Sequence, residues 1–115
     1  MSNFNEDENL VKDICSSIKE EDWFKSLSFP LEIYRGFKQR KENLNKKDLG
    51  LSWTTDFDIA AEAAGENGTI AIAKIFENGI NKEETLERNK AFELMEHEIV
   101  PKNTSFLKNI KFRQN

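Results

Sequence analysis

Two glutamates stand one residue apart in the stretch LMEHEIVPKNTSF, which covers residues 94 to 106. The run around them is typical of an extended strand, and side chains two apart on a strand point to the same side. We therefore expect Glu96 and Glu98 to project together from one face of a sheet. Two like charges so placed destabilise a fold unless solvent screens them or a cationic ligand uses them. The pair predicts either a solvated edge or a binding site.

An arginine stands on the apolar side of an earlier predicted strand. In LEIYRGF, residues 31 to 37, alternation places Arg35 on the same face as Leu31, Ile33 and Phe37. A guanidinium offers a planar fork of donors suited to phosphate oxygens. It can also extend its stem over an apolar face and reach water. Arg35 is thus either an anion-binding residue or a surface residue.

Two hydroxyl side chains stand one residue apart on the next predicted strand. In LGLSWTT, residues 49 to 55, Ser52 and Thr54 share one side of the strand. The opposite side carries Leu49, Leu51, Trp53 and Thr55. Alone, the two hydroxyls suit the polar face of an ordinary strand. With Arg35 and the two glutamates, they form an ordered set of polar residues on three predicted strands.

The remaining elements follow from hydrophobic periodicity. Residues 8 to 24 have the stripe of an amphipathic helix, which places Cys15 in the core. Thr55 and Asp58 have the capping-box spacing for a second helix, which ends at Gly65. Residues 69 to 76 are apolar on both faces, as in a buried central strand. Residues 81 to 91 are either a short helix or a mobile loop, and a last alternating segment spans residues 106 to 112. This order predicts an α+β domain with more strands than helices.

The ordered polar residues resemble the signature of the mono-ADP-ribosyltransferases of the Arg-Ser-Glu class, which is Arg, then Ser-x-Ser/Thr, then Glu/Gln-x-Glu. Here the motifs read IYRGF, GLSWTTD and EHEIVPKNT, and the resemblance covers roughly residues 31 to 112. It implies one compact domain over residues 1–115, with residues 1–8 flexible. The implied fold is a split β-sheet core with an N-terminal helix and a helix after the Ser-x-Thr strand. The chain departs from the family in its threonines, where serine is frequent, and in its short length.

The resemblance also implies an activity, which is cleavage of the nicotinamide–ribose bond of NAD and transfer of ADP-ribose to a macromolecule. NAD is then a substrate, and no metal is expected. The implied catalytic residues are Glu98, Glu96, Arg35 and Ser52. The implied NAD-binding residues are Arg35, Gly36, Ser52, Thr54 and Glu98.

Each implied residue has a chemical task. Because the transition state is oxocarbenium-like, Glu98 would stabilise the developing positive charge and bind the ribose 2′-hydroxyl. Ser52 would hold Glu98 or the ribose, and Thr54 would support the strand. Glu96 would orient or deprotonate the acceptor. A glutamate at that position favours arginine as the acceptor within the family.

The bulk composition limits the class of protein. A chain of 115 residues, 37% hydrophobic and 33% charged, is typical of one soluble globular domain. It has no apolar run near 20 residues, and MSNFNEDENL is not a signal peptide, so we expect a cytoplasmic protein that contacts no membrane. A single cysteine cannot form an internal disulfide, and one histidine cannot complete a Cys/His zinc site.

The charge distribution bears on the partner. A net charge of −4 argues against nucleic-acid binding by general electrostatics. Residues 35 to 47 nevertheless carry six Lys or Arg against one Glu, which indicates a solvated loop or a phosphate-binding patch. We expect a protein target, with a nucleic-acid target as the alternative through this basic loop.

Other functions compete with ADP-ribosyl transfer. Water as the acceptor would make the chain an NAD glycohydrolase. A non-catalytic acidic binding or inhibitor module on the same fold could cover a basic partner, but the joint presence of Arg35, Ser52 and Glu98 favours the enzyme. A glycosidase-like hydrolase fits poorly, because two carboxylates on one strand face cannot flank a scissile bond.

Overall fold

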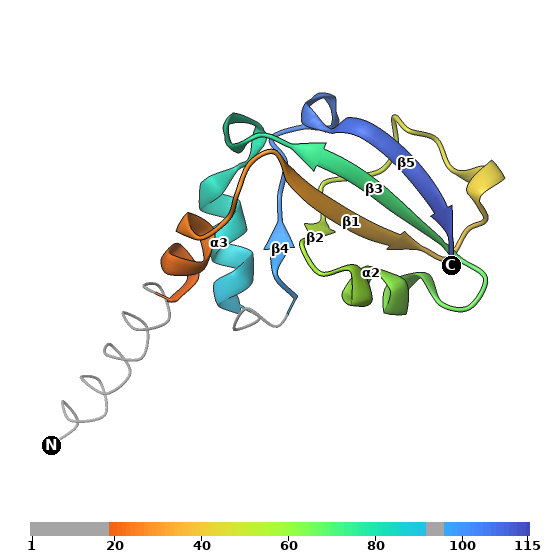
Figure 1. The fold of residues 1–115 in the computed structure, drawn as a ribbon, viewed down its shortest axis with the longest axis horizontal. Coiled ribbons are helices and arrows are strands. Elements are labelled where there is room, and N and C mark those ends of the chain that lie inside the picture. Colours follow the sequence, from red (N-terminus) through yellow and green to blue (C-terminus); the bar gives the residue numbers. More distant parts are fainter. Residues whose placement is uncertain (1–18, 92–95) are drawn as a thin grey trace, which may run out of the picture.

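The computed structural model describes residues 19–91 and 96–115. Within them, five strands form one antiparallel sheet in the order β4-β2-β1-β3-β5 (Figure 1). The α+β class is therefore confirmed, whereas the described strands form a single sheet and not the split sheet that the resemblance implies. Residues 19–25 are helical. Cys15 and the rest of the predicted first helix lie outside the described residues.

The elements have the following bounds. The strands are β1 (Leu31–Phe37), β2 (Trp53–Thr54), β3 (Thr69–Ile75), β4 (Glu98–Ile99) and β5 (Lys108–Gln114). The helices are α2 (Phe57–Ala64) and α3 (Lys82–Ala91), with 3-10 turns η1 (Lys41–Asn43), η2 (Glu77–Gly79) and η3 (Thr104–Phe106).

The long pair β1 and β3 forms the centre of the sheet. Arg35 pairs with Ala71 in the antiparallel register. As predicted, Ile33 is fully buried in the main core, while Tyr34 packs on the opposite face with α2. Strand β3 is buried on both faces, because Ala71 and Ala73 lie in the main core and Ile70 lies under α2. Alternation therefore predicted the centre of the sheet correctly.

Helix α2 lies directly on β1. A Cβ placed on Gly36 would lie 2.0 Å from the Ala60 carbonyl oxygen, so this close approach requires glycine. The helix is capped by Asp56, whose side chain accepts a hydrogen bond from the Asp58 N–H at 2.9 Å. The prediction of Thr55 as the cap is wrong, because the Thr55 N–H still donates to the His97 carbonyl and the helix starts one residue later.

The predicted strand over residues 49 to 55 is shorter in the structure. Gly50 has a φ of +76°, which turns the backbone, and the Trp53 indole N–H donates to the Gly50 carbonyl at 2.9 Å across this turn. Leu51 is 39% exposed, whereas Leu49 and Trp53 are buried. The glycine therefore breaks the alternation, and only Trp53–Thr54 pairs as a strand.

The polar segment over residues 81 to 91 is a helix. The Asn81 side chain accepts from the Glu84 N–H at 3.1 Å and so caps the start of α3. Thr85 and Asn89 are four residues apart, which places both on one side of the helix, and both are buried against β4. The helix forms because these polar side chains have partners in the sheet.

Candidate functional site

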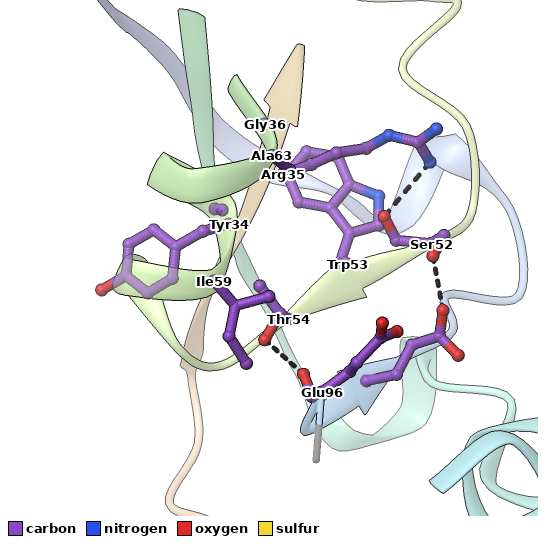
Figure 2. Close-up of a pocket in the computed structure, with 11 residues that line it drawn as sticks. Tyr34, Arg35, Gly36, Ser52, Trp53, Thr54, Ile59, Ala63 and Glu96 are labelled. Atoms are coloured by element: carbon purple, nitrogen blue, oxygen red, sulfur yellow. Dashed lines mark hydrogen bonds between the residues drawn. The ribbon is translucent and has the colours of Figure 1, made fainter. Parts of the chain in front are cut away.

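The residues singled out in the three motifs converge on one cavity. It has a volume of about 240 Å³ and lies between β1, β2, α2 and the segment that leads into β4 (Figure 2). Its lining includes all six predicted site residues, which are Arg35, Gly36, Ser52, Thr54, Glu96 and Glu98. The rest of the lining is largely apolar and comes from Tyr34, Trp53, Ile59, Ala60 and Ala63.

Glu98 is a buried carboxylate in the cavity wall. Only 6% of the residue is exposed. Its Oε1 accepts a hydrogen bond from the Ser52 hydroxyl at 2.5 Å and a longer one from Arg88 Nη1 at 3.4 Å. Its Oε2 is buried and has no hydrogen-bond partner among the described residues. Buried polar atoms are nearly always paired, so this half-satisfied carboxylate indicates a site for a cation or a donor.

Ser52 connects the other two motifs. Its hydroxyl donates to Glu98, and its carbonyl oxygen accepts from Arg35 Nη1 at 3.1 Å. Both interactions are drawn as dashed lines in Figure 2. The residue comes just before β2, between the strand of Arg35 and the strand of Glu98. One serine thus sets the relative positions of a cationic and an anionic side chain.

Arg35 is held in place by three neighbours. Its guanidinium lies 5.1 Å from the centre of the Phe37 ring, besides its hydrogen bond to Ser52. A Cβ on Gly50 would lie 2.7 Å from Arg35 Nη1, so Gly50 leaves the space that the guanidinium fills. Burial lowers the pKa of Arg35 below its ordinary value, and the nearby Glu98 charge offsets part of this shift. The side chain stays cationic, because the guanidinium is effectively never deprotonated in proteins.

Glu96 and Glu98 do not share a strand face, so that prediction is wrong. Strand β4 begins at Glu98, and His97 has a φ of +45°, in the left-handed region. This turn breaks the period-two alternation, which leaves Glu96 exposed while Glu98 is buried. The Thr54 hydroxyl donates to the Glu96 carbonyl at 2.6 Å and accepts from the Asp56 N–H. Thr54 therefore holds the backbone of the turn.

Gly36 and Tyr34 line the cavity but have other structural roles. The absence of a side chain at Gly36 is explained by the close approach of α2. The Tyr34 hydroxyl donates to Glu32 at 2.6 Å, and this hydrogen bond raises the pKa of Tyr34 to about 12. Figure 2 shows the Tyr34 ring pointing away from Ser52 and Glu96.

Helix α3 supplies side chains that sequence reasoning missed. The Asn89 amide donates to the Glu98 carbonyl at 2.7 Å and accepts from the Glu98 N–H at 2.8 Å. The Thr85 hydroxyl accepts from the Val100 N–H at 3.0 Å. The signal in the sequence was the i, i+4 spacing of Thr85 and Asn89 in a polar helix, which alone does not separate buried from solvated side chains.

Apart from Arg35, which lines the cavity, the cations of the basic loop are exposed. They are Lys38, Arg40, Lys41, Lys46 and Lys47.

In the part of the chain that the structure describes, no cluster of His, Cys, Asp and Glu could hold a metal ion. No helix in that same part is long and apolar enough to span a membrane.

Comparisons of the chain with protein-family models, with curated proteins and with solved structures found no match. The function is therefore inferred from the cavity itself, whose chemistry depends on one cation, one buried carboxylate and the serine between them.

Proposed function

We propose that the chain is an NAD-dependent ADP-ribosyltransferase, which cleaves the nicotinamide–ribose bond and passes ADP-ribose to a macromolecular acceptor. The observation that carries the proposal is the buried carboxylate of Glu98, held by the Ser52 hydroxyl at 2.5 Å in a cavity that Arg35 also lines. A fixed negative charge in a partly dehydrated site stabilises positive charge that develops on a ribose.

Each residue has a role in the proposed reaction. The bond between C1′ and the nicotinamide nitrogen breaks, and its electron pair leaves with nicotinamide. Glu98 stabilises the positive charge that remains on the ribose, while Ser52 keeps the carboxylate in place. Arg35 offers donors to a phosphate or ribose oxygen. The acceptor then bonds to C1′ and loses a proton.

The size of the cavity suits one end of NAD. Ligand pockets are usually about 300–1,000 Å³, and this cavity is about 240 Å³. We therefore expect only the nicotinamide riboside end, which contains the bond to be broken, to enter the cavity, with the adenosine end outside. The apolar lining from Trp53, Ile59 and Ala63 is compatible with an aromatic ring.

NAD hydrolysis is a second candidate, favoured by the position of Glu96. This residue lies outside β4 and is exposed, so it is separated from the buried Glu98 by the turn at His97. An exposed acceptor-binding residue leaves water free to react at C1′. Transfer and hydrolysis would then share Glu98 and differ only in the acceptor.

The deciding experiment uses NAD labelled in its adenylate half, the purified chain and a cell lysate. Label in macromolecules supports transfer, and free labelled ADP-ribose supports hydrolysis. An Asn78→Ala variant, changed at an exposed position away from this cavity, is the matched control and should behave as wild type. If NAD stays intact under all conditions, the proposal is wrong. The remaining hypothesis is then a non-catalytic acidic binding module.

A further inference from the structure

Helix α3 fixes the backbone of the residue that carries the buried carboxylate. Asn89 hydrogen bonds both the N–H and the carbonyl of Glu98, as a neighbouring strand would do. The Asn89 amide also donates to the Thr85 carbonyl at 2.8 Å, so its own orientation is fixed within α3. The Cα of Glu98 therefore has a defined position before any side-chain contact is considered.

Arg88, on the same helix, reaches the carboxylate of Glu98. Its Nη1 lies 3.4 Å from Glu98 Oε1, and its Nε lies 3.0 Å from Glu84 Oε1. The hydrogen bond to Glu84 is the main cause of the raised pKa of Arg88, to which Glu98 also contributes. One guanidinium thus bridges the half-exposed carboxylate of Glu84 and the buried one of Glu98, and Glu84 restricts where the guanidinium can lie.

The two donors to Glu98 act on the same oxygen from different elements. Ser52 approaches Oε1 from the segment before β2, and Arg88 approaches it from α3. Oε2 has no partner among the described residues. Two donors on one oxygen restrict rotation of the carboxylate, so the free oxygen is held in a defined direction. Arg88 is not part of the cavity lining, unlike Arg35.

We propose that Arg88 is a positioning residue that orients the Glu98 carboxylate, with Glu84 holding Arg88 in place. This inference rests on the proposed function, because the orientation matters for the reaction of NAD. Arg88 Nη1 and Glu98 Oε1 are 3.4 Å apart, which is long for a charge-assisted hydrogen bond, and 38% of the Arg88 side chain is exposed, so the contact should contribute little to folding. The contact instead fixes the orientation of the Glu98 carboxylate, which matters because a small misplacement of a catalytic group slows a reaction strongly. Loss of Arg88 should therefore lower kcat more than it changes KM.

The kinetic test compares three substitutions in NAD turnover. Arg88→Gln removes the charge, and we expect kcat to fall about 10-fold with KM changed less than about 2-fold. Arg88→Lys keeps the charge but lacks the planar fork of donors, so its kcat should lie between those of Arg88→Gln and wild type. Lys90→Gln, with the same loss of charge on the same helix, should match wild type. Unchanged kcat in Arg88→Gln, or an equal loss in Lys90→Gln, would overturn the inference.

A second measurement needs no NAD. The carbon-13 resonance of the Glu98 carboxyl, assigned by its loss in Glu98→Gln, should shift in Arg88→Gln and stay in place in Lys90→Gln. Thermal unfolding of each variant confirms that it is folded. A resonance unmoved by Arg88→Gln would show that the contact is absent. A moved resonance in a chain that never turns over NAD would overturn the proposed function and, with it, the catalytic purpose of the contact.

Discussion

At the scale of single residues, the two glutamates of EHE have different surroundings and should have different effects. Glu98→Gln keeps a hydrogen-bond acceptor for Ser52 but removes the charge, so transfer and NAD hydrolysis should both fall about 10²-fold or more, or about 2.7 kcal/mol. Glu96→Gln should abolish transfer to arginine and leave hydrolysis measurable, because Glu96 is exposed and its proposed task is to prepare the acceptor. Assays of labelled nicotinamide release and of protein labelling separate the two reactions. Parallel losses in both variants would contradict this division of roles.

Tyr34 gives a second prediction at this scale, because it is the chain's single tyrosine. Its hydrogen bond to Glu32 raises the pKa to about 12, against about 10 for an unfolded chain. A raised pKa means that the contribution to stability is complete below pH 10 and is lost as the pH rises toward 12. Absorbance of tyrosinate should therefore titrate near 12 in the folded protein, and Glu32→Ala should lower the midpoint. An unchanged midpoint in that variant would refute the assigned cause.

At the scale of elements, the two hydrogen bonds between the Asn89 side chain on α3 and the Glu98 backbone on β4 lead to a prediction about stability. Asn89→Ala leaves the Glu98 N–H and carbonyl buried without their partner, and each orphaned group costs about 1–3 kcal/mol. For Asn89→Ala we expect a lower free energy of unfolding in urea denaturation. The slope of that free energy against urea concentration should be the same as in wild type. Glu87→Ala, exposed on the same helix, should change stability by no more than about 0.5 kcal/mol. Equal effects of the two substitutions would show that the hydrogen bonds from Asn89 do not stabilise β4.

The elements also show how far the sequence could be interpreted. The period-two alternation in β1 and the apolar run of β3 predicted their positions because burial dominates in those strands. The family resemblance implied that Ser52 holds either Glu98 or the ribose, and in the structure the Ser52 hydroxyl donates to Glu98. Alternation failed at Gly50 and His97, because a residue with positive φ breaks the extended conformation on which alternation depends. The contacts of Asn89 could not be predicted, since they depend on how α3 docks and not on local pattern.

At the scale of the whole molecule, the site and the basic loop differ in electrostatic character. The cavity contains two glutamates and one arginine, whereas the loop carries exposed cations on a chain of net charge −4. Salt screens exposed charges strongly and buried ones much less. The dependence of activity on ionic strength therefore reports which of these two regions meets the acceptor.

For a protein acceptor approached through the cavity, we expect the double substitution of Lys46 and Lys47 by Gln to leave transfer unchanged. The logarithm of the apparent affinity should then vary little with the logarithm of salt concentration. A nucleic-acid acceptor bound by the loop would give a steep slope, which shrinks by about 1 for each phosphate-contacting cation removed. Lys108→Gln is the matched control, because this exposed lysine lies on β5 outside the loop. A steep slope that the double substitution reduces, and the control does not, would replace the protein acceptor with a nucleic acid, because such a dependence requires phosphates at the loop.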